Sequence, residues 1–202
     1  MPTIIKSDAF AEWIDKLRDR AGAAQVLRRL ARLERGNPGN VAPVGEGVSE
    51  LKIDFGPGYR VYFGQRGQEL VIILAGGEKS SQERDIKAAK KIWNEWENME
   101  RMEGAKPMTK AKFSAFDVAD HIKTPDDAAH YLDAVLADGD ANEIAEALGV
   151  VARSQGMAAI AEESGLSRET LYRTLSDAGN PRLATLLGVL RAMGLRLSVA
   201  AA

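Results

Sequence analysis

Lysine and arginine residues recur at strand positions and strand ends in the stretch from Val48 to Lys79. The cations concerned are Lys52, Arg60 and Lys79. Antiparallel strands bring residues that are distant in sequence side by side, so these three charges can gather on one concave surface. Clustered cations suit a polyanion, because they neutralise its negative charge. We therefore take this stretch as the first candidate for a functional surface.

Three short strands are predicted to carry these cations. Leu51–Phe55 alternates apolar and polar residues, as a half-buried strand does, and Gly56–Gly58 then breaks the run. The strand pattern resumes at Tyr59–Phe63 and turns again at Arg66–Gln68. Leu70–Ala75 has no polar face, which predicts a central strand covered on both sides.

Two helices and an edge strand are predicted ahead of this sheet. The edge strand covers residues 1–6, and Ser7 can cap a helix that runs to about Arg20. Ala21–Gly22 interrupts the helical pattern, and a second helix is expected over Ala23–Arg35. Residues 36–47 are rich in Gly and Pro, so we expect a loop there.

The second helix carries a row of arginines. A solvated face explains such a row, and so does a contact with phosphates or with an acidic partner. After the sheet, Ser80–Glu83 fits a capping box and predicts a helix towards Met102. The arginines of the row are Arg28, Arg29, Arg32 and Arg35.

The remainder of the chain is predicted to be helical. Thr124 precedes Pro125 and two acids, which indicates a helix from Pro125 to about Asp138. Asp140 can cap a helix over 141–155, and Asn180–Pro181 starts a last helix that ends near Met193. Leu195–Val199 alternates and predicts a short C-terminal strand.

Residues 157–176 have the pattern of a helix-turn-helix. Ala161 is small where two helices cross closely, Gly165 lies at the turn, and Ser167 can cap the second helix. An ordinary helical hairpin is the alternative. In a helix-turn-helix the start of the second helix faces the major groove, where Arg donates to guanine and Ser or Thr holds phosphate. The predicted DNA-binding residues are Ser167, Arg168, Glu169, Thr170 and Arg173.

Composition restricts the class of protein. The chain has 202 residues, of which 45% are hydrophobic and 28% are charged, as in soluble globular proteins. It has no Cys and two His, which excludes thiolate metal sites and Cys nucleophiles, and we expect neither a metal nor a cofactor. No apolar run reaches the roughly 20 residues of a membrane span. The N-terminus has no signal-peptide layout, so we expect a cytoplasmic protein without membrane contact.

Charge divides the chain into two parts. Residues 1–91 hold 16 Lys/Arg against 12 Asp/Glu, a balance of +4, whereas residues 108–202 hold 9 against 13, a balance of −4. Opposite charge favours attraction between the parts, and we expect the acidic segment Asp117–Asp140 to lie on the basic one. The predicted domains are 1–103 and 111–202, joined by a linker at 104–110.

The stretch 113–199 resembles the HigA-like antitoxins, which are Cro/C1-type regulators. Phe116–Asp120, Leu166–Arg173 and Asn180–Pro181 carry the resemblance. It implies a DNA-binding antitoxin that represses its own promoter. We expect a homodimer through the final helix and Leu195–Val199, bound to an inverted repeat in operator DNA.

Residues 1–100 resemble the HigB-type, phage-derived branch of the RelE/ParE toxin superfamily. The resemblance rests on Val44–Asp54, Gly58–Phe63 and Gly76–Ile86. It implies two helices on a small antiparallel sheet, a C-terminal helix, and metal-independent cleavage of mRNA on the ribosome. In that reaction the 2′-OH attacks the adjacent phosphate, so the protein must accept a proton, stabilise the phosphorane and protonate the leaving oxygen.

The resemblance implies roles for four cations. Arg60 would bind the scissile phosphate, Lys79 would be a cation near the end of the last strand, and Arg84 would be a further phosphate contact. Lys52 would act as a base only if neighbouring cations made its ammonium give up a proton. Lys52 and Arg84 are equally well explained as surface cations.

The acid and base of the reaction stay open. Residues 1–100 contain no His, which excludes a pair of histidines. A role in the core explains Trp93 and Trp96 as well as a role in the site does, and Tyr59 or Tyr62 is a candidate to stack a base.

The sequence thus predicts an α+β domain followed by an all-α helix-turn-helix domain. The leading hypothesis is a type II toxin–antitoxin module in one chain, whose endoribonuclease is inhibited by the fused antitoxin. One rival is a transcription regulator with an inactive first domain. Another is a ParE-like gyrase poison, which shares the fold and lacks the catalytic cations.

Overall fold

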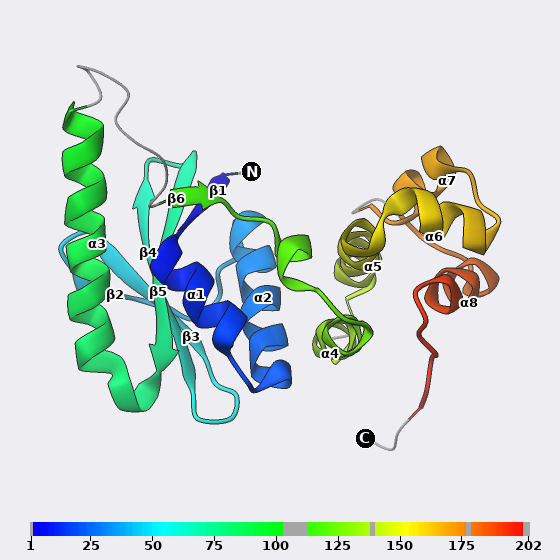
Figure 1. Ribbon diagram of the computed structural model, residues 1–202, viewed down its shortest axis with the longest axis horizontal. Helices are drawn as coiled ribbons and strands as arrows, with labels where there is room; N and C mark the ends of the chain where they lie inside the picture. Colours follow the sequence, from blue (N-terminus) through cyan, green and yellow to red (C-terminus); the bar gives the residue numbers. More distant parts are fainter. Residues whose placement is uncertain (1, 103–112, 138–139, 177–178, 200–202) are drawn as a thin grey trace. The chain divides into compact units, whose positions relative to one another are not determined.

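The computed structural model describes residues 2–102, 113–137, 140–176 and 179–199 (Figure 1). The chain forms two compact units, Met1–Asp117 and Val118–Ala202. A mixed α+β unit thus precedes a helical one. The predicted linker at 104–110 lies outside the described residues.

The first unit is built on one mixed sheet. Along its width the strands run in the order β2-β3-β4-β5-β1-β6, and every neighbouring pair is antiparallel except β1 with β5. The predicted meander of β3, β4 and β5 is confirmed. The strands are β1 (Thr3–Ser7), β2 (Val41–Gly45), β3 (Val48–Ile53), β4 (Tyr59–Arg66), β5 (Leu70–Glu78) and β6 (Phe113–Ala115).

Two expectations for this sheet are wrong. The first strand is not at an edge, because β1 pairs with β5 on one side and with β6 on the other. Part of the predicted 36–47 loop is the edge strand β2, since the backbone of Val41–Gly45 pairs with β3 despite its Gly and Pro content. Strand β6 lies in the first unit, although the sequence pattern assigned its residues to the second domain.

Helices cover both faces of the sheet. Helices α1 (Asp8–Lys16) and α2 (Arg20–Glu34) lie on one face and α3 (Gln82–Met102) lies on the other (Figure 1). On the α3 face, Trp93 and Trp96 pack in a core cluster with Tyr62 and with apolar residues of β5. Strand β5 is therefore covered on both sides, as its apolar run predicts.

The break between the first two helices differs from the prediction. Helix α1 ends at Lys16, and Asp19 caps α2 by accepting a hydrogen bond from the Gly22 amide. Gly22 therefore lies inside α2 instead of interrupting it. A side chain at this position would overlap the Tyr59 ring, so glycine lets the helix approach the sheet.

The arginine row of α2 is not a solvated face. Arg28 is buried, and the other three arginines are half-buried. Arg29 donates a hydrogen bond to the Pro38 carbonyl. Burial and the neighbouring Arg32 and Arg28 lower the pKa of Arg29. Arg29 therefore packs against the loop after α2, which the helical periodicity alone does not reveal.

The second unit is a helical bundle. The predicted caps are confirmed: Thr124 and Asp127 form a capping box on α4, and the Asp140 carboxylate caps α5. The predicted strand at Leu195–Val199 is wrong, because these residues form neither helix nor strand. The elements are η3 (Val118–His121), α4 (Pro125–Leu136), α5 (Ala141–Gln155), α6 (Met157–Ser164), α7 (Arg168–Thr174) and α8 (Leu183–Ala192).

The helices that the structure describes include none that is both long enough and apolar enough to cross a membrane.

Candidate functional site

Lys52 and Arg60 lie directly opposite each other on neighbouring strands. They are paired positions of β3 and β4, and the next pair along the same face is Glu50 with Tyr62. Directly paired residues of an antiparallel ladder project from the same face of the sheet. Because Tyr62 belongs to the core cluster beneath α3, both cations lie on the α3 face. The structure thus brings together two of the predicted catalytic residues.

Arg60 is a buried cation with a weak anionic partner. Its residue is 6% exposed, and its Nη1 donates to the Tyr59 carbonyl at 2.9 Å. The nearest carboxylate oxygen in its ion pair is Asp54 Oδ1, 3.8 Å away, and the Asp54 side chain is 76% exposed. Within the described residues its buried Nε has no hydrogen-bond partner. A phosphate oxygen could displace this distant carboxylate as the partner of Nη1.

Lys79 lies beside Arg60. The Lys79 amide donates to the Gly58 carbonyl at 2.7 Å. A Cβ placed on Gly58 would lie 3.5 Å from Lys79 Cβ and 3.7 Å from Arg60 Nη1, so the two cations flank this glycine. Gly58 has a φ of +78°, a conformation that side chains disfavour, so the turn between the two cations favours glycine.

Arg84 is separate from this group. Its side chain is 81% exposed, and its Nε lies 3.3 Å from Asp85 Oδ1. Arg84 and Lys79 both line an open pocket of about 1090 Å³ at the start of α3, together with Trp13 and Gly77. Lys52 and Arg60 are not among the residues that line this pocket. Arg84 thus shares a pocket with Lys79 but not with Lys52 or Arg60.

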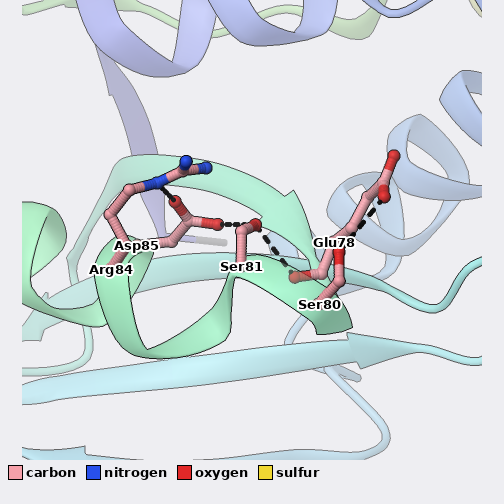
Figure 2. A network of polar contacts seen from close by, with 5 residues as sticks. All are labelled: Glu78, Ser80, Ser81, Arg84 and Asp85. Atoms are coloured by element: carbon pink, nitrogen blue, oxygen red, sulfur yellow. Dashed lines mark hydrogen bonds and ion pairs between the residues drawn. The ribbon is translucent and has the colours of Figure 1, made fainter.

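A polar network fixes the start of α3 (Figure 2). The Ser81 hydroxyl contacts the Glu78 carbonyl and donates to Asp85 Oδ2, while Ser80 bonds the Glu78 carboxylate. Asp85 is buried and also holds Arg84. A side chain at Gly77 would overlap Asp85, so this glycine admits the carboxylate beside the sheet. Ser81 thus bonds a residue one turn along the helix.

Sequence reasoning missed the buried polar residues next to the cations. Glu50 is 3% exposed and accepts a hydrogen bond from Gln82 Nε2 at 2.8 Å. Its other oxygen lies 3.3 Å from Lys52 Nζ, so Lys52 is paired with a carboxylate and is not surrounded by cations alone. The available signal was Glu50 itself, an ionisable residue at an inward position between Val48 and Lys52.

Tyr62 completes this polar group. The residue has no exposed surface, and its hydroxyl has no hydrogen-bond partner in the part of the chain that the structure describes. Burial raises the pKa of Tyr62 to about 12, and the charges of Glu50 and Asp85 add to the rise. A neutral phenol therefore persists beside two carboxylates throughout the ordinary pH range.

The expectation that Tyr59 or Tyr62 stacks a base is wrong. Both rings are buried, and the Tyr59 hydroxyl donates to Asp19 at 2.7 Å. Trp93 and Trp96 are core residues that stack on each other, with ring centroids 5.1 Å apart.

In the second unit, α6 and α7 are joined by a short turn. Gly165 ends α6 in the left-handed conformation, with φ at +70°, and the Ser167 hydroxyl caps α7 by accepting from the Thr170 amide. Ser167 also donates to the Thr170 hydroxyl at 2.8 Å, so the two hydroxyls bond each other. The remaining predicted DNA-binding side chains, Arg168, Glu169 and Arg173, are exposed. Tyr172, which the sequence pattern did not single out, is 49% exposed on the same helix.

The second part of the chain is similar to known proteins. Residues 112–201 match a family described as probable addiction module antidote protein. A curated protein of Haemophilus influenzae is 44% identical over 86 residues, which cover 43% of this chain and 87% of the relative. A second protein of the same organism is 40% identical over 84 residues, which cover 42% and 87%. Both are described only as uncharacterized proteins, and no solved structure matches the chain.

Through residues 112–201, this chain belongs to the family of probable addiction module antidote proteins. Its role is therefore related to toxin–antitoxin modules, and a toxin is the partner that the family implies.

Proposed function

We propose that the chain is a type II toxin–antitoxin module in one polypeptide. Its first unit is an mRNA-cleaving toxin, and its second unit is a DNA-binding antidote that represses its own promoter. One observation carries the proposal. The antidote match spans only residues 112–201, whereas the residues before it form most of a compact unit with the buried Arg60 opposite Lys52.

The chemistry of the first unit follows from the charges around Arg60. In the proposed reaction, a backbone phosphate of mRNA on the ribosome replaces Asp54 as the partner of Arg60, and Lys52 and Lys79 share its charge. Fixed donors that meet the phosphorane lower the barrier, because charge accumulates on its oxygens. We assign the role of base for the 2′-OH to Glu50, whose carboxylate is held by Gln82 and Lys52. The 2′-oxygen then bonds to phosphorus, the bond from phosphorus to the 5′-oxygen breaks, and the 5′-oxygen leaves with a proton from solvent. Arg84 has an outer, auxiliary role.

The second unit is proposed to read DNA with α7. Arg168 and Arg173 are exposed on this helix and would contact guanine edges or phosphates, while Glu169 would accept from cytosine. Ser167 and Thr170 keep the helix start in place through their mutual hydrogen bond. A homodimer on an inverted repeat would place two copies of α7 about one helical turn apart.

The test of the first unit requires a suitable boundary. Residues 1–117 are the appropriate fragment, because they retain β6 and match the compact unit. When expressed alone in a bacterial host, this fragment should arrest growth and produce new mRNA ends in translated regions. The full chain should do neither. Glu50→Gln in the fragment should remove the cleavage while the sheet remains folded.

Three results would count against the proposal. Intact mRNA together with blocked DNA gyrase would favour a gyrase poison. A folded but harmless fragment would favour a transcription regulator with an inactive first unit. Full mRNA cleavage by the intact chain would remove the antidote role of the second unit towards this toxin.

A vector that expresses Arg66→Met in the fragment provides a matched control, since Arg66 is an exposed arginine at the far end of β4.

A further inference from the structure

Strand β6 occupies an edge that β1 would otherwise expose. Its three residues pair antiparallel with β1, in the register Ser7 with Phe113, Lys6 with Ser114 and Ile5 with Ala115. The Phe116 amide extends the ladder by donating to the Ile4 carbonyl at 3.0 Å. A three-residue strand has no stability of its own, so it depends on the sheet that receives it.

Two phenylalanines fix this segment on opposite faces of the sheet. Phe113 packs against the core cluster beneath α3, which contains Trp93 and Trp96. Phe116 is 6% exposed and meets Phe10 of α1 edge-on, with ring centroids 6.1 Å apart. Aromatic side chains inserted in this way dominate the energy of many interfaces, because they bury large apolar areas at a small cost in rotamer entropy.

Lys6 specifies where the segment lies. Its residue is only 8% exposed, its ammonium donates to the Ala115 carbonyl at 3.2 Å, and its Nζ lies 5.5 Å from the centroid of the Phe116 ring. Removal of the segment would take away both of these contacts from a largely buried cation. A strand that presents a carbonyl followed by an aromatic ring therefore fits the β1 edge.

The position of the segment in the chain is the decisive observation. The antidote match begins at residue 112, so β6 and Phe116 belong to the antidote part of the sequence. Their backbone nevertheless completes the sheet of the first unit. We propose that residues 113–117 are a docking strand, by which the antidote captures its toxin through addition to the β1 edge. The names toxin and antidote here rest on the proposed function.

The docking strand holds the partner without blocking the candidate active site. Strand β6 is at one edge of the sheet, whereas Lys52 and Arg60 lie on β3 and β4, separated from it by β5 and β1. Capture and inhibition are thus different tasks of the antidote, and 113–117 performs the first.

The test uses the full chain with a protease recognition sequence in place of residues 104–110. After cleavage, the two fragments should remain associated, and the dissociation constant can be measured by surface-immobilised binding. Phe116→Ala should raise this constant about tenfold or more, as expected for a buried aromatic anchor. Phe55→Ala is the matched control, since Phe55 is exposed in the first unit, and it should leave the constant unchanged.

A peptide of residues 113–120 provides a second measurement that leaves the protein unaltered. In excess it should accelerate dissociation of the cleaved wild-type fragments, and the same peptide with Phe116→Ala should not. An unchanged dissociation constant for Phe116→Ala, or no effect of the wild-type peptide, would overturn the docking strand. Neither measurement involves RNA. A docking strand that passes both tests beside a fragment 1–117 that leaves mRNA intact would refute the proposed toxin activity alone.

Discussion

Replacement of Arg60 by methionine separates its proposed catalytic role from its role in the fold. Methionine keeps an apolar stem of similar length in the buried site and removes the guanidinium. The ion pair with the exposed Asp54 at 3.8 Å contributes at most about 1 kcal/mol. Loss of the hydrogen bond to the Tyr59 carbonyl costs about 1 kcal/mol more. The total loss of stability is therefore about 2 kcal/mol or less.

The loss of activity should be much larger. If Arg60 meets the phosphorane, its removal takes away a fixed donor, which typically costs about 10²–10³-fold in rate. The assay is the rate of mRNA cleavage by fragment 1–117 in a translating extract, with the urea midpoint of each variant measured in parallel. Arg60→Lys should retain part of the activity, because it keeps the charge without the paired donors.

One result would refute this reasoning. A folded Arg60→Met fragment that cleaves mRNA within threefold of the wild-type rate would show that the buried guanidinium is structural. A threefold change in rate corresponds to a change of about 0.6 kcal/mol in the activation free energy. Arg66→Met should be active in the same assay, since Arg66 lies at the other end of β4.

Three further predictions concern stability and DNA binding. The raised pKa of Tyr62 means that its contribution to stability is present below its unfolded pKa near 10 and is lost as the pH rises towards about 12. The urea midpoint of the wild type should therefore fall over this pH range, and the midpoint of Tyr62→Phe should fall less. An equal fall in both proteins would show that Tyr62 does not cause the loss of stability. Gly64→Ala should destabilise the first unit by about 1–3 kcal/mol, because a methyl group would overlap the Trp93 ring. Gly188→Ala, whose Cβ would meet no neighbour in α8, is its control in thermal unfolding. Arg168→Ala or Arg173→Ala should weaken operator binding by about 1–3 kcal/mol in gel shifts at several salt concentrations, and equal affinity of the wild type and both variants would remove α7 from the DNA interface.

The meander and the helix caps follow from local rules, which is why the sequence could predict them. Ser7, Thr124 and Asp140 act within one helical turn, and their hydrogen bonds depend on little else. The alternation at Leu51 and Ile53 likewise records a buried face of β3, whereas Phe55 lies beyond the end of the strand and is exposed. These features require no knowledge of distant residues.

The errors arise where distant residues decide. Gly22 breaks a helix by propensity, yet here it makes room for Tyr59 from another element. The sequence of residues 1–6 predicts an edge strand, but the distant segment Phe113–Ala115 pairs with it and takes the edge position. Val41–Gly45 is a strand because its backbone pairs with the backbone of β3.

The candidate site shows the same division. Lys52 and Arg60 could be paired from the hairpin pattern alone, since a short turn fixes the register between them. The contact between Glu50 and Gln82 joins a strand to a helix 32 residues later, and no short-range pattern predicts it.

The parallel pairing of β1 with β5 has a consequence for synthesis on the ribosome. Thr3 is made before its partner Leu70 and well before the strand at Phe113–Ala115, because it precedes both in the chain. Until both arrive, the nascent chain carries an unpaired strand that can recruit foreign β-structure. A message broken within the codons of α3 would release a protein with that edge still open. The sheet can thus be completed only after translation has entered the antidote part of the chain, because β6 lies in that part.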